Sequence, residues 1–394
     1  MHTFRVVVYR IMRVFARLYF RIRGDYEWQD FTPKYKANLI LTNHTTNWDF
    51  LYMGMAFKGH TYFVASEHIF RAGFVSKAIR FLVDPIARKK GSSAVGTTKE
   101  ILKRLKAGQN VCMMVEGNRS FTGETGFISP NAGALAKKSG AGLINFCVHG
   151  GYFVNPRWSR TVRKGKVWGV FSGEYGPEEL KDLTNEEVAD IINRDLYVDA
   201  FKDQEEKDYS YTCAAPAETL ETALFACPHC GEFHSLRSSG DRLVCEKCGS
   251  VHVFTEKGFF ERPDGSAPAF STVLEWYRWQ KEKLGDLLKD AADKEPFLVR
   301  EDEGAGLYEV HPLEGKRPVL NGKLALYSNR MEIRGERTLS FLLTDIVSMA
   351  IVLTNTMLFT TEDNTYYEMQ LPERVSALLY LISFYSLTGK EYKR

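Results

Sequence analysis

A histidine and an aspartate five residues apart form the first arrangement that could do chemistry. His44 and Asp49 follow a short apolar run, Ala37–Thr42, and precede a helix-like run, Leu51–Phe57. At a strand-to-helix turn the carboxylate can hold one imidazole nitrogen and leave the other to accept a proton. The pair therefore predicts a general base. The alternative is a structural histidine, the more common role of a lone histidine near a strand end.

A second polar turn follows another apolar run. Val111–Val115 leads into the sequence EGNRS at residues 116–120. The glycine permits a turn that exposes backbone N–H groups, and Arg119 can hold a phosphate through two parallel hydrogen bonds. Upstream, Arg88 begins a basic loop, RKKG, at residues 88–91. Taken alone, that loop is equally explained as a solvated charge run.

Alternating strand and helix patterns must position these turns. Further apolar strands are predicted at Leu143–Val148 and Val167–Phe171, and a helix at Asn185–Phe201. This alternation predicts an α/β domain over residues 25–205, in which helices cover a sheet and the chemistry lies at strand ends.

In order and spacing, these motifs resemble those of glycerolipid acyltransferases, above all the 1-acylglycerol-3-phosphate (lysophosphatidic acid) acyltransferase family. The resemblance rests on His44 and Asp49, the Arg88 loop and the EGNRS segment, and covers roughly residues 35–205. It implies transfer of an acyl group from a thioester, acyl-CoA or acyl-ACP (acyl carrier protein), to the free hydroxyl of a lysophospholipid. Such a transferase would belong to phospholipid biosynthesis.

The expected catalytic residues are His44 and Asp49. An alcohol must lose its proton as it attacks a thioester, so the reaction needs a positioned base, typically worth about 10²–10⁴-fold in rate. His44 is expected to be that base, and Asp49 to fix its tautomer and stabilise the imidazolium. Because histidine need not become acylated, direct transfer without an acyl-enzyme is expected.

The other site residues are expected to bind substrate. The turn at Gly117 would supply N–H donors for the tetrahedral oxyanion, where one lost donor typically costs about 3–4 kcal/mol. Arg119, assisted by Arg88, would hold the acceptor's phosphate. Glu116 is expected to orient the loop and Ser120 to cap the turn.

The N-terminal segment is strongly basic. Residues 1–23 hold six arginines and no acidic residue, whereas the whole chain has a net charge of +3. On a helix, one face carries Arg10, Arg13, Arg17 and Arg21, and most of the other carries Val7, Val8, Ile11, Val14, Phe15, Leu18 and Tyr19. Residues 1–24 are therefore predicted to form an amphipathic helix on an anionic membrane surface. Alternatively, the apolar face packs on the protein and the arginines are merely solvated.

Arginines interrupt every apolar run near the N-terminus, so neither a signal peptide nor a membrane span is expected. Scattered cysteines outside one cluster favour a reducing compartment. Cys112 and Cys147 lie inside apolar strand runs and are expected to be buried, inert thiols. The expected location is therefore the cytoplasmic face of the cell membrane, as a peripheral, monotopic protein.

Four of the seven cysteines lie within 22 residues of one another. Cys227, Cys230, Cys245 and Cys248 form two similar turns, CPHCG and CEKCG. This spacing predicts structural zinc in a small ribbon over residues 223–262, with iron or disulfides as alternatives. The ribbon lacks a dense basic patch, so nucleic-acid binding is not expected and a protein partner or an interdomain role is favoured.

A linker (206–222) and a helical connector (263–295) join these parts to a third pattern. Residues 296–394 show seven short alternating runs and a closing helix from Pro372, which predicts an all-β barrel resembling a pleckstrin-homology (PH) domain. With 11 basic and 13 acidic residues, this segment favours protein interaction or packing over phosphoinositide binding.

Two functions from different classes fit these patterns. The first is a peripheral membrane acyltransferase. The second is a catalytically idle, acyltransferase-like scaffold that binds protein partners through its ribbon and PH-like domain. The joint presence of His44, Asp49, Gly117 and Arg119 favours the enzyme.

Overall fold

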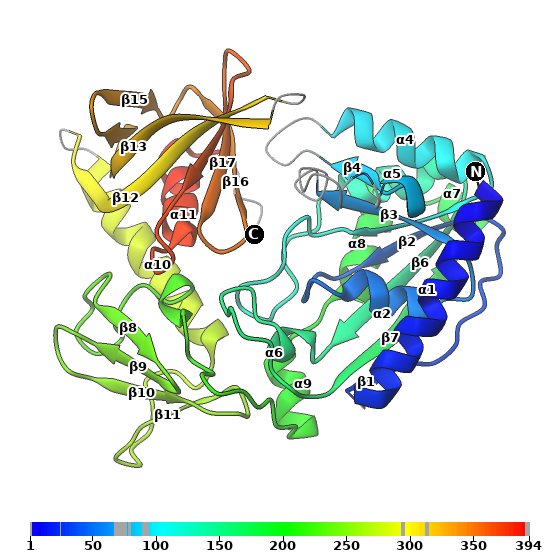
Figure 1. Ribbon diagram of the computed structural model, residues 1–394, viewed down its shortest axis with the longest axis horizontal. Coiled ribbons are helices and arrows are strands. Elements are labelled where there is room, and N and C mark those ends of the chain that lie inside the picture. The colour runs from blue at the N-terminus through cyan, green and yellow to red at the C-terminus, as the bar shows by residue number, and fades with distance from the viewer. Residues whose placement is uncertain are drawn as a thin grey trace.

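Three β-sheets organise the part of the chain that the structure describes. The structure is a computed structural model and describes residues 2–23, 25–66, 77, 80–88, 94–292, 296–311 and 315–390. An N-terminal α/β domain lies on the right of Figure 1, with a small four-stranded sheet and a larger C-terminal sheet on the left. Helix α10 (Val273–Ala292) connects the two sheets on the left.

The N-terminal sheet has seven strands among the described residues. In spatial order they are β1 (Tyr26–Glu27), β7 (Val167–Tyr175), β6 (Gly142–His149), β2 (Asn38–Thr42), β5 (Asn110–Met114), β3 (Thr61–Ser66) and β4 (Ile86–Arg88). Neighbouring strands are parallel except β6 and β7. The carboxyl ends of β2, β5 and β6 therefore meet at one edge, which is where the two polar turns begin.

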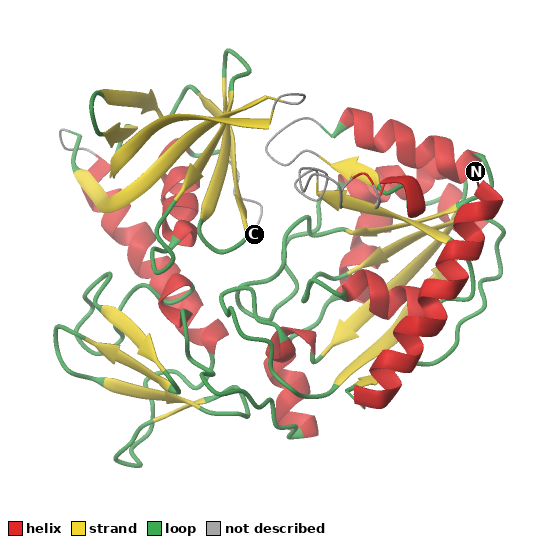
Figure 2. Ribbon diagram, in the orientation of Figure 1, coloured by secondary structure: helices red, strands yellow, loops and turns green. Residues whose placement is uncertain are grey.

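Helices cover both faces of this sheet, as Figure 2 shows and as the sequence predicts. One face carries α4 (Val95–Lys106), α5 (Asn131–Ser139) and α8 (Asn185–Leu196), and the other carries α1 (His2–Arg23) and α2 (Asp49–Ala56). Short helices follow at α6 (Gly151–Val154), α7 (Pro177–Lys181) and α9 (Ala200–Lys207). Alternate side chains of β2 pack on opposite faces of the sheet. Leu39 and Leu41 pack in the core with α4, α5 and α8, and Ile40 packs in the core that contains α2.

Helix α1 turns its central arginines toward the domain. Arg13 and Arg17 donate to the carbonyl oxygen of Met55, in the last turn of α2, at 2.9 and 2.5 Å. Arg5 donates to Asp84 at 2.5 Å. Cations are favoured at a helix C-terminus because its last carbonyls lack helical partners and carry partial negative charge. The side chains that face solvent include Val14 (65% exposed), Phe15 (67%), Leu18 (53%) and Ile22 (77%).

The structure has a helix, α1, over His2–Arg23, inside the predicted range 1–24, and its contact with a membrane surface stays a prediction. Arg13 and Arg17 bind the domain, and only Arg10 and Arg21 of the four predicted arginines are exposed. The alternative, in which the apolar face packs on the protein, is wrong, since Val14, Phe15 and Leu18 face solvent. The partial negative charge at the C-terminus of α2 attracts Arg13 and Arg17, and this contact leaves the apolar face of α1 toward solvent.

The small sheet lies against the N-terminal domain. Its strands are antiparallel, in the order β11 (Phe260–Glu261), β10 (Val251–Phe254), β9 (Arg242–Cys245) and β8 (Leu236–Ser239), after a 3₁₀ turn η2 (Leu220–Thr222). Phe254 meets Trp158 edge-on, with ring centroids 5.7 Å apart. The buried guanidinium of Arg163 lies over both rings.

The C-terminal sheet has the seven strands that the pattern predicts, with longer first strands. In spatial order they are β15 (Thr338–Leu342), β14 (Arg330–Arg334), β13 (Gly315–Tyr327), β12 (Leu298–His311), β18 (Tyr366–Gln370), β17 (Thr356–Thr361) and β16 (Ile346–Val352). Phe341 of β15 packs edge-on against Phe359 and Tyr367, so the sheet curls over itself. The edge strands β15 and β16 do not pair within the described residues, and the predicted barrel is not closed.

Helix boundaries differ from the sequence predictions in three places. The helix expected at 185–201 is two helices, because Asp199 caps a new helix by accepting from the N–H of Phe201. The closing helix expected from Pro372 is α11 (Ala377–Thr388), capped by Ser376. The helical connector expected over residues 263–295 contains α10, which begins only at Val273. Within the described residues, no helix combines the length and apolarity that crossing a membrane requires.

Candidate active site

The loop from β2 to α2 holds His44 and Asp49 together. The Nδ1 atom of His44 lies 2.8 Å from Asp49 Oδ2. Asp49 is fully buried and also accepts hydrogen bonds from the N–H and hydroxyl groups of Thr45 and Thr46. These donors stabilise a carboxylate at the start of α2, where the helix dipole also favours negative charge. A carboxylate that is fixed in this way favours the tautomer with the imidazole proton on Nδ1.

The second motif clamps the backbone of the histidine. Glu116 Oε1 accepts from the N–H of His44 at 2.6 Å, and Glu116 Oε2 accepts from the N–H of Gly126 at 2.5 Å. The N–H of Ser120 donates to the carbonyl oxygen of His44 at 3.0 Å. The two motifs, more than 70 residues apart in the sequence, thus form one rigid unit.

Gly117 and Ser120 shape the loop that follows β5. Gly117 has φ of 72°, a left-handed conformation that a residue with a side chain rarely adopts. The hydroxyl of Ser120 accepts from the N–H of Gly123 at 3.0 Å and donates to the carbonyl of Glu124 at 2.7 Å. These contacts agree with the expected turn-capping role of Ser120 and with a loop held in one conformation.

The two predicted phosphate-binding arginines lie on different elements, Arg88 at the end of β4 and Arg119 in the loop after β5. Arg119 is half-buried and donates through Nη1 to the side-chain oxygen of Asn155 at 2.8 Å and to its carbonyl at 3.2 Å. Burial lowers the pKa of Arg119, and Asp49 partly opposes that shift. Burial also lowers the pKa of Arg88, at the end of β4, and is opposed there by Tyr366 of the C-terminal sheet. Residues 89–91 of the predicted basic loop lie outside the described residues.

A cavity of about 930 Å³ opens beside the histidine. His44, Arg88 and Gly117 all line it, whereas Asp49, Glu116, Arg119 and Ser120 do not. The wall of the cavity is largely aliphatic and includes Val64, Ile101, Leu102, Met113 and Leu135. The site thus combines a histidine–carboxylate pair, an exposed glycine turn, a cation and an apolar wall.

Comparison with known families gives a match to this part of the chain. The Acyltransferase family model matches residues 25–149. The matched segment contains His44, Asp49, Arg88 and residues 116–120, so both motifs of the site lie inside it. Curated proteins give no match to the chain.

Solved structures give further similarities. A 1-acyl-sn-glycerophosphate (LPA) acyltransferase, PlsC, from Thermotoga maritima is 22% identical, with a TM-score of 0.41, over 49% of this chain and 79% of its own. The C-terminal domain of an unknown protein from Leishmania infantum is 11% identical (TM-score 0.14; 24% of this chain, 82% of its own). The linker-DH/PH domains of p115-RhoGEF are 13% identical (TM-score 0.19; 30% of this chain, 44% of theirs).

The two strand cysteines of the N-terminal α/β domain are buried. Burial raises the pKa of Cys147 to about 12 and raises the pKa of Cys112 further. A thiol with such a pKa stays protonated near neutral pH and is a poor nucleophile. This agrees with the expectation that neither is reactive.

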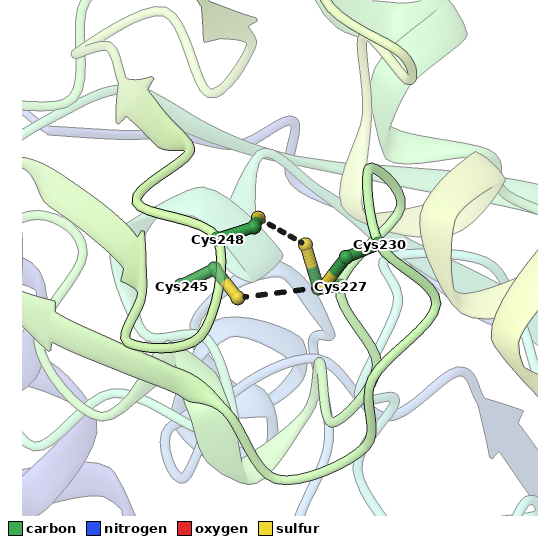
Figure 3. A group of neighbouring side chains, drawn as sticks. All are labelled: Cys227, Cys230, Cys245 and Cys248. Atoms are coloured by element: carbon green, nitrogen blue, oxygen red, sulfur yellow. Dashed lines mark hydrogen bonds between the residues drawn. The ribbon is translucent and has the colours of Figure 1, made fainter.

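The four-cysteine cluster forms a compact group at the tips of the small sheet, where the four sulfurs converge (Figure 3). The Sγ atoms of Cys227 and Cys248 lie 3.8 Å apart, and those of Cys230 and Cys245 lie 3.7 Å apart. A tetrahedral zinc ion with Zn–S bonds of about 2.3 Å separates its sulfurs by about 3.8 Å. The residues present therefore fit zinc. Gly231 and Gly249, both with positive φ, close the two turns in the same way.

Sequence reasoning missed the residues that hold Arg119. Asn155 binds its side chain and Arg157 binds its carbonyl oxygen, from a segment that follows α6. Neither residue belongs to a motif, and the contacts depend on how α6 packs against the loop after β5. A single sequence carries no signal for them.

Proposed function

We propose that the protein is a peripheral membrane acyltransferase that acylates the free hydroxyl of lysophosphatidic acid or a related lysophospholipid. The acyl donor is acyl-CoA or acyl-ACP. The juxtaposition of the His44–Asp49 pair with the EGNRS loop, on a cavity with an aliphatic wall, supports this function. The aliphatic wall suits an acyl chain, and Arg88 suits an anionic headgroup.

The chemical step is direct transfer. The acceptor hydroxyl attacks the thioester carbonyl carbon, a carbon–oxygen bond forms, and the carbon–sulfur bond breaks. His44 takes the hydroxyl proton and returns it to the leaving thiolate, while Asp49 stabilises the imidazolium. N–H groups of the Gly117 turn stabilise the oxyanion. Arg88 binds the phosphate of the acceptor from the cavity wall, and Arg119, which lies outside the cavity but close enough to Asp49 to interact with its charge, completes that binding site from the loop after β5.

Incubation of the purified chain with lysophosphatidate and acyl-CoA is expected to yield phosphatidate, detected by mass spectrometry of the extracted lipids. Acyl-ACP and lysolipids with other headgroups complete the screen and define donor and acceptor. Absence of product with every donor and acceptor would favour the scaffold, in which the small sheet and the C-terminal sheet bind protein partners. Heat-denatured protein is the control for spontaneous transacylation.

Membrane contact through the apolar face of α1, at the cytoplasmic face of the cell membrane, is the second part of the proposal. Val14, Phe15, Leu18 and Ile22 face solvent, while Arg13 and Arg17 bind the domain. An apolar helix face inserts at the boundary between headgroups and acyl chains. Each side chain that is fully buried on insertion contributes about 1.5–3 kcal/mol. The exposed Arg10 and Arg21 can add contacts with anionic headgroups.

The double substitution Phe15→Asp with Ile22→Asp is expected to lower binding to phosphatidylcholine–phosphatidylglycerol vesicles at least about tenfold in a sedimentation assay. Val347→Asp is the matched control, because Val347 is 56% exposed on β16 of the C-terminal sheet. Equal sedimentation of both variants and the unaltered protein would place membrane contact elsewhere.

A further inference from the structure

Arg157 joins the C-terminal sheet to the acyltransferase domain. Its side chain is buried, with the residue only 4% exposed. Nη2 donates to the carbonyl of Ile351 at 3.0 Å, and Nε donates to the carbonyl of Leu353 at 3.3 Å. Ile351 lies in β16 and Leu353 in the turn that leads to β17, so one guanidinium holds the tip of the β16–β17 hairpin.

The same guanidinium also holds the active-site loop. Nη1 of Arg157 donates to the carbonyl oxygen of Arg119 at 3.0 Å. The guanidinium carbon lies 4.2 Å from the ring centroid of Phe121, a buried residue of the same loop. Asn155, two residues before Arg157, accepts from the side chain of Arg119. One short segment therefore fixes both the backbone and the side chain of the predicted phosphate-binding arginine.

We propose that Arg157 is a positioning residue through which the β16–β17 hairpin keeps Arg119 oriented for the acyl acceptor. This inference rests on the proposed function for its effect on catalysis, but the coupling between hairpin and loop does not. Removing the hairpin contacts should let the loop after β5 move, so that Arg119 meets the acceptor's phosphate less often. The C-terminal sheet then contributes to acceptor binding without touching the acceptor.

The geometry requires a guanidinium. Three carbonyl oxygens from two domains are bound by three different nitrogens of one planar group. An ammonium is a point charge on a flexible stem and cannot reproduce this fixed fork or the stacking on Phe121. Lysine at position 157 should therefore behave more like alanine than like arginine.

The first test compares steady-state kinetics of Arg157→Ala with those of Arg160→Ala. Arg160 pairs with Glu373 across the same two domains at 2.6 Å but is exposed. Arg157→Ala is expected to raise the KM for lysophosphatidate at least about tenfold with kcat within about threefold, because uniform binding is lost. Arg160→Ala should leave both constants unchanged. Equal constants for Arg157→Ala and the unaltered enzyme would overturn the inference.

A double-variant cycle separates positioning from general damage. If Arg157 acts through Arg119, the variant Arg119→Ala with Arg157→Ala should have nearly the same KM for the acceptor as Arg119→Ala alone. Fully additive losses would mean that Arg157 acts by another route, and would overturn the inference. Thermal melting of each variant shows whether the fold is retained.

Hydrogen exchange of peptides covering residues 117–126 tests the coupling without turnover. Arg157→Ala should exchange faster there than the unaltered protein, and Arg160→Ala should not. Leu353 has φ of 55°, so Leu353→Pro must move the hairpin tip, whereas Leu353→Gly can keep it. Faster exchange in Leu353→Pro alone supports the coupling, and unchanged exchange in both Arg157→Ala and Leu353→Pro refutes it. If the unaltered protein makes no product, the proposed function fails while these exchange data still decide the coupling.

Discussion

Replacing His44 by alanine is expected to lower kcat for acyl transfer by about 10²–10⁴-fold. The expected loss is large because, among the described residues that line the cavity, His44 is the one histidine, and Asp49, which Thr45 and Thr46 fix, presents Oδ2 to its imidazole. The KM for the acceptor should change little, because the proton transfer stabilises the transition state and not the bound substrate. Product formation is measured under saturating lysophosphatidate and acyl donor.

The chain provides a matched control for this substitution. His149 also pairs with an aspartate, since its Nδ1 lies 2.7 Å from Asp203, and it stacks on Trp168. It does not line the cavity beside His44. His149→Ala should therefore retain activity. Similar rates for His44→Ala and the unaltered enzyme would dismiss His44 as the base, whereas loss of activity in both variants would point to a structural effect.

The sequence predicts the central strands of the N-terminal α/β domain well, for a physical reason. β2 and β6 are buried on both faces, and β5 is buried at Val111 and Cys112 and half-buried elsewhere, so each appears as an apolar run that ends where its polar turn begins. Since parallel strands end at one edge of a sheet, the two motifs are brought together by topology alone. The clamp that Glu116 and Ser120 place on His44 is a consequence of that meeting.

The orientation of α1 shows what a helical wheel cannot supply. The wheel separates arginines from apolar residues, but it does not show which of the two faces contacts the rest of the protein. The carbonyl of Met55 at the end of α2 accepts from Arg13 and Arg17, and a buried helix terminus without such donors would be costly. That requirement arises only when α1 and α2 lie side by side, so the sequence alone does not show that Arg13 and Arg17 bind the domain.

The C-terminal sheet shows a similar limit. Alternation and turn residues locate its strands within a few positions, yet closure of a barrel depends on how far the edge strands β15 and β16 curl toward each other. The contact between Phe341 and Phe359 brings β15 over the face of the sheet near β17, but β15 and β16 form no ladder in the described residues. Arg157 is the extreme case, because its three carbonyl partners come from segments more than 230 residues apart in the chain.

Replacing Cys245 by serine is expected to remove bound zinc from the four-cysteine cluster. The unaltered protein should hold about one zinc per chain by elemental analysis, and the variant should hold almost none, because structural zinc sites of this type bind with an apparent free energy of about 10–16 kcal/mol that depends on the full ligand set. Cys245 is fully buried and shares the spacing of the other sulfurs. Loss of the ion also leaves the turns at Gly231 and Gly249 without a common centre, so peptides from residues 223–262 should exchange hydrogen faster.

Cys213→Ser is the matched control, since Cys213 lies outside the cluster and accepts from the hydroxyl of Thr161. It should keep its zinc and its exchange pattern. Iron in place of zinc, no metal in the unaltered protein, or full zinc occupancy in Cys245→Ser would each contradict the assignment. Because Phe254 and Arg163 join the small sheet to Trp158, just after Arg157, zinc loss should also loosen the segment that holds Arg119. Faster exchange at residues 117–126 in Cys245→Ser, but not in Cys213→Ser, would show that a metal site at the far end of the molecule helps to keep the acceptor site in place.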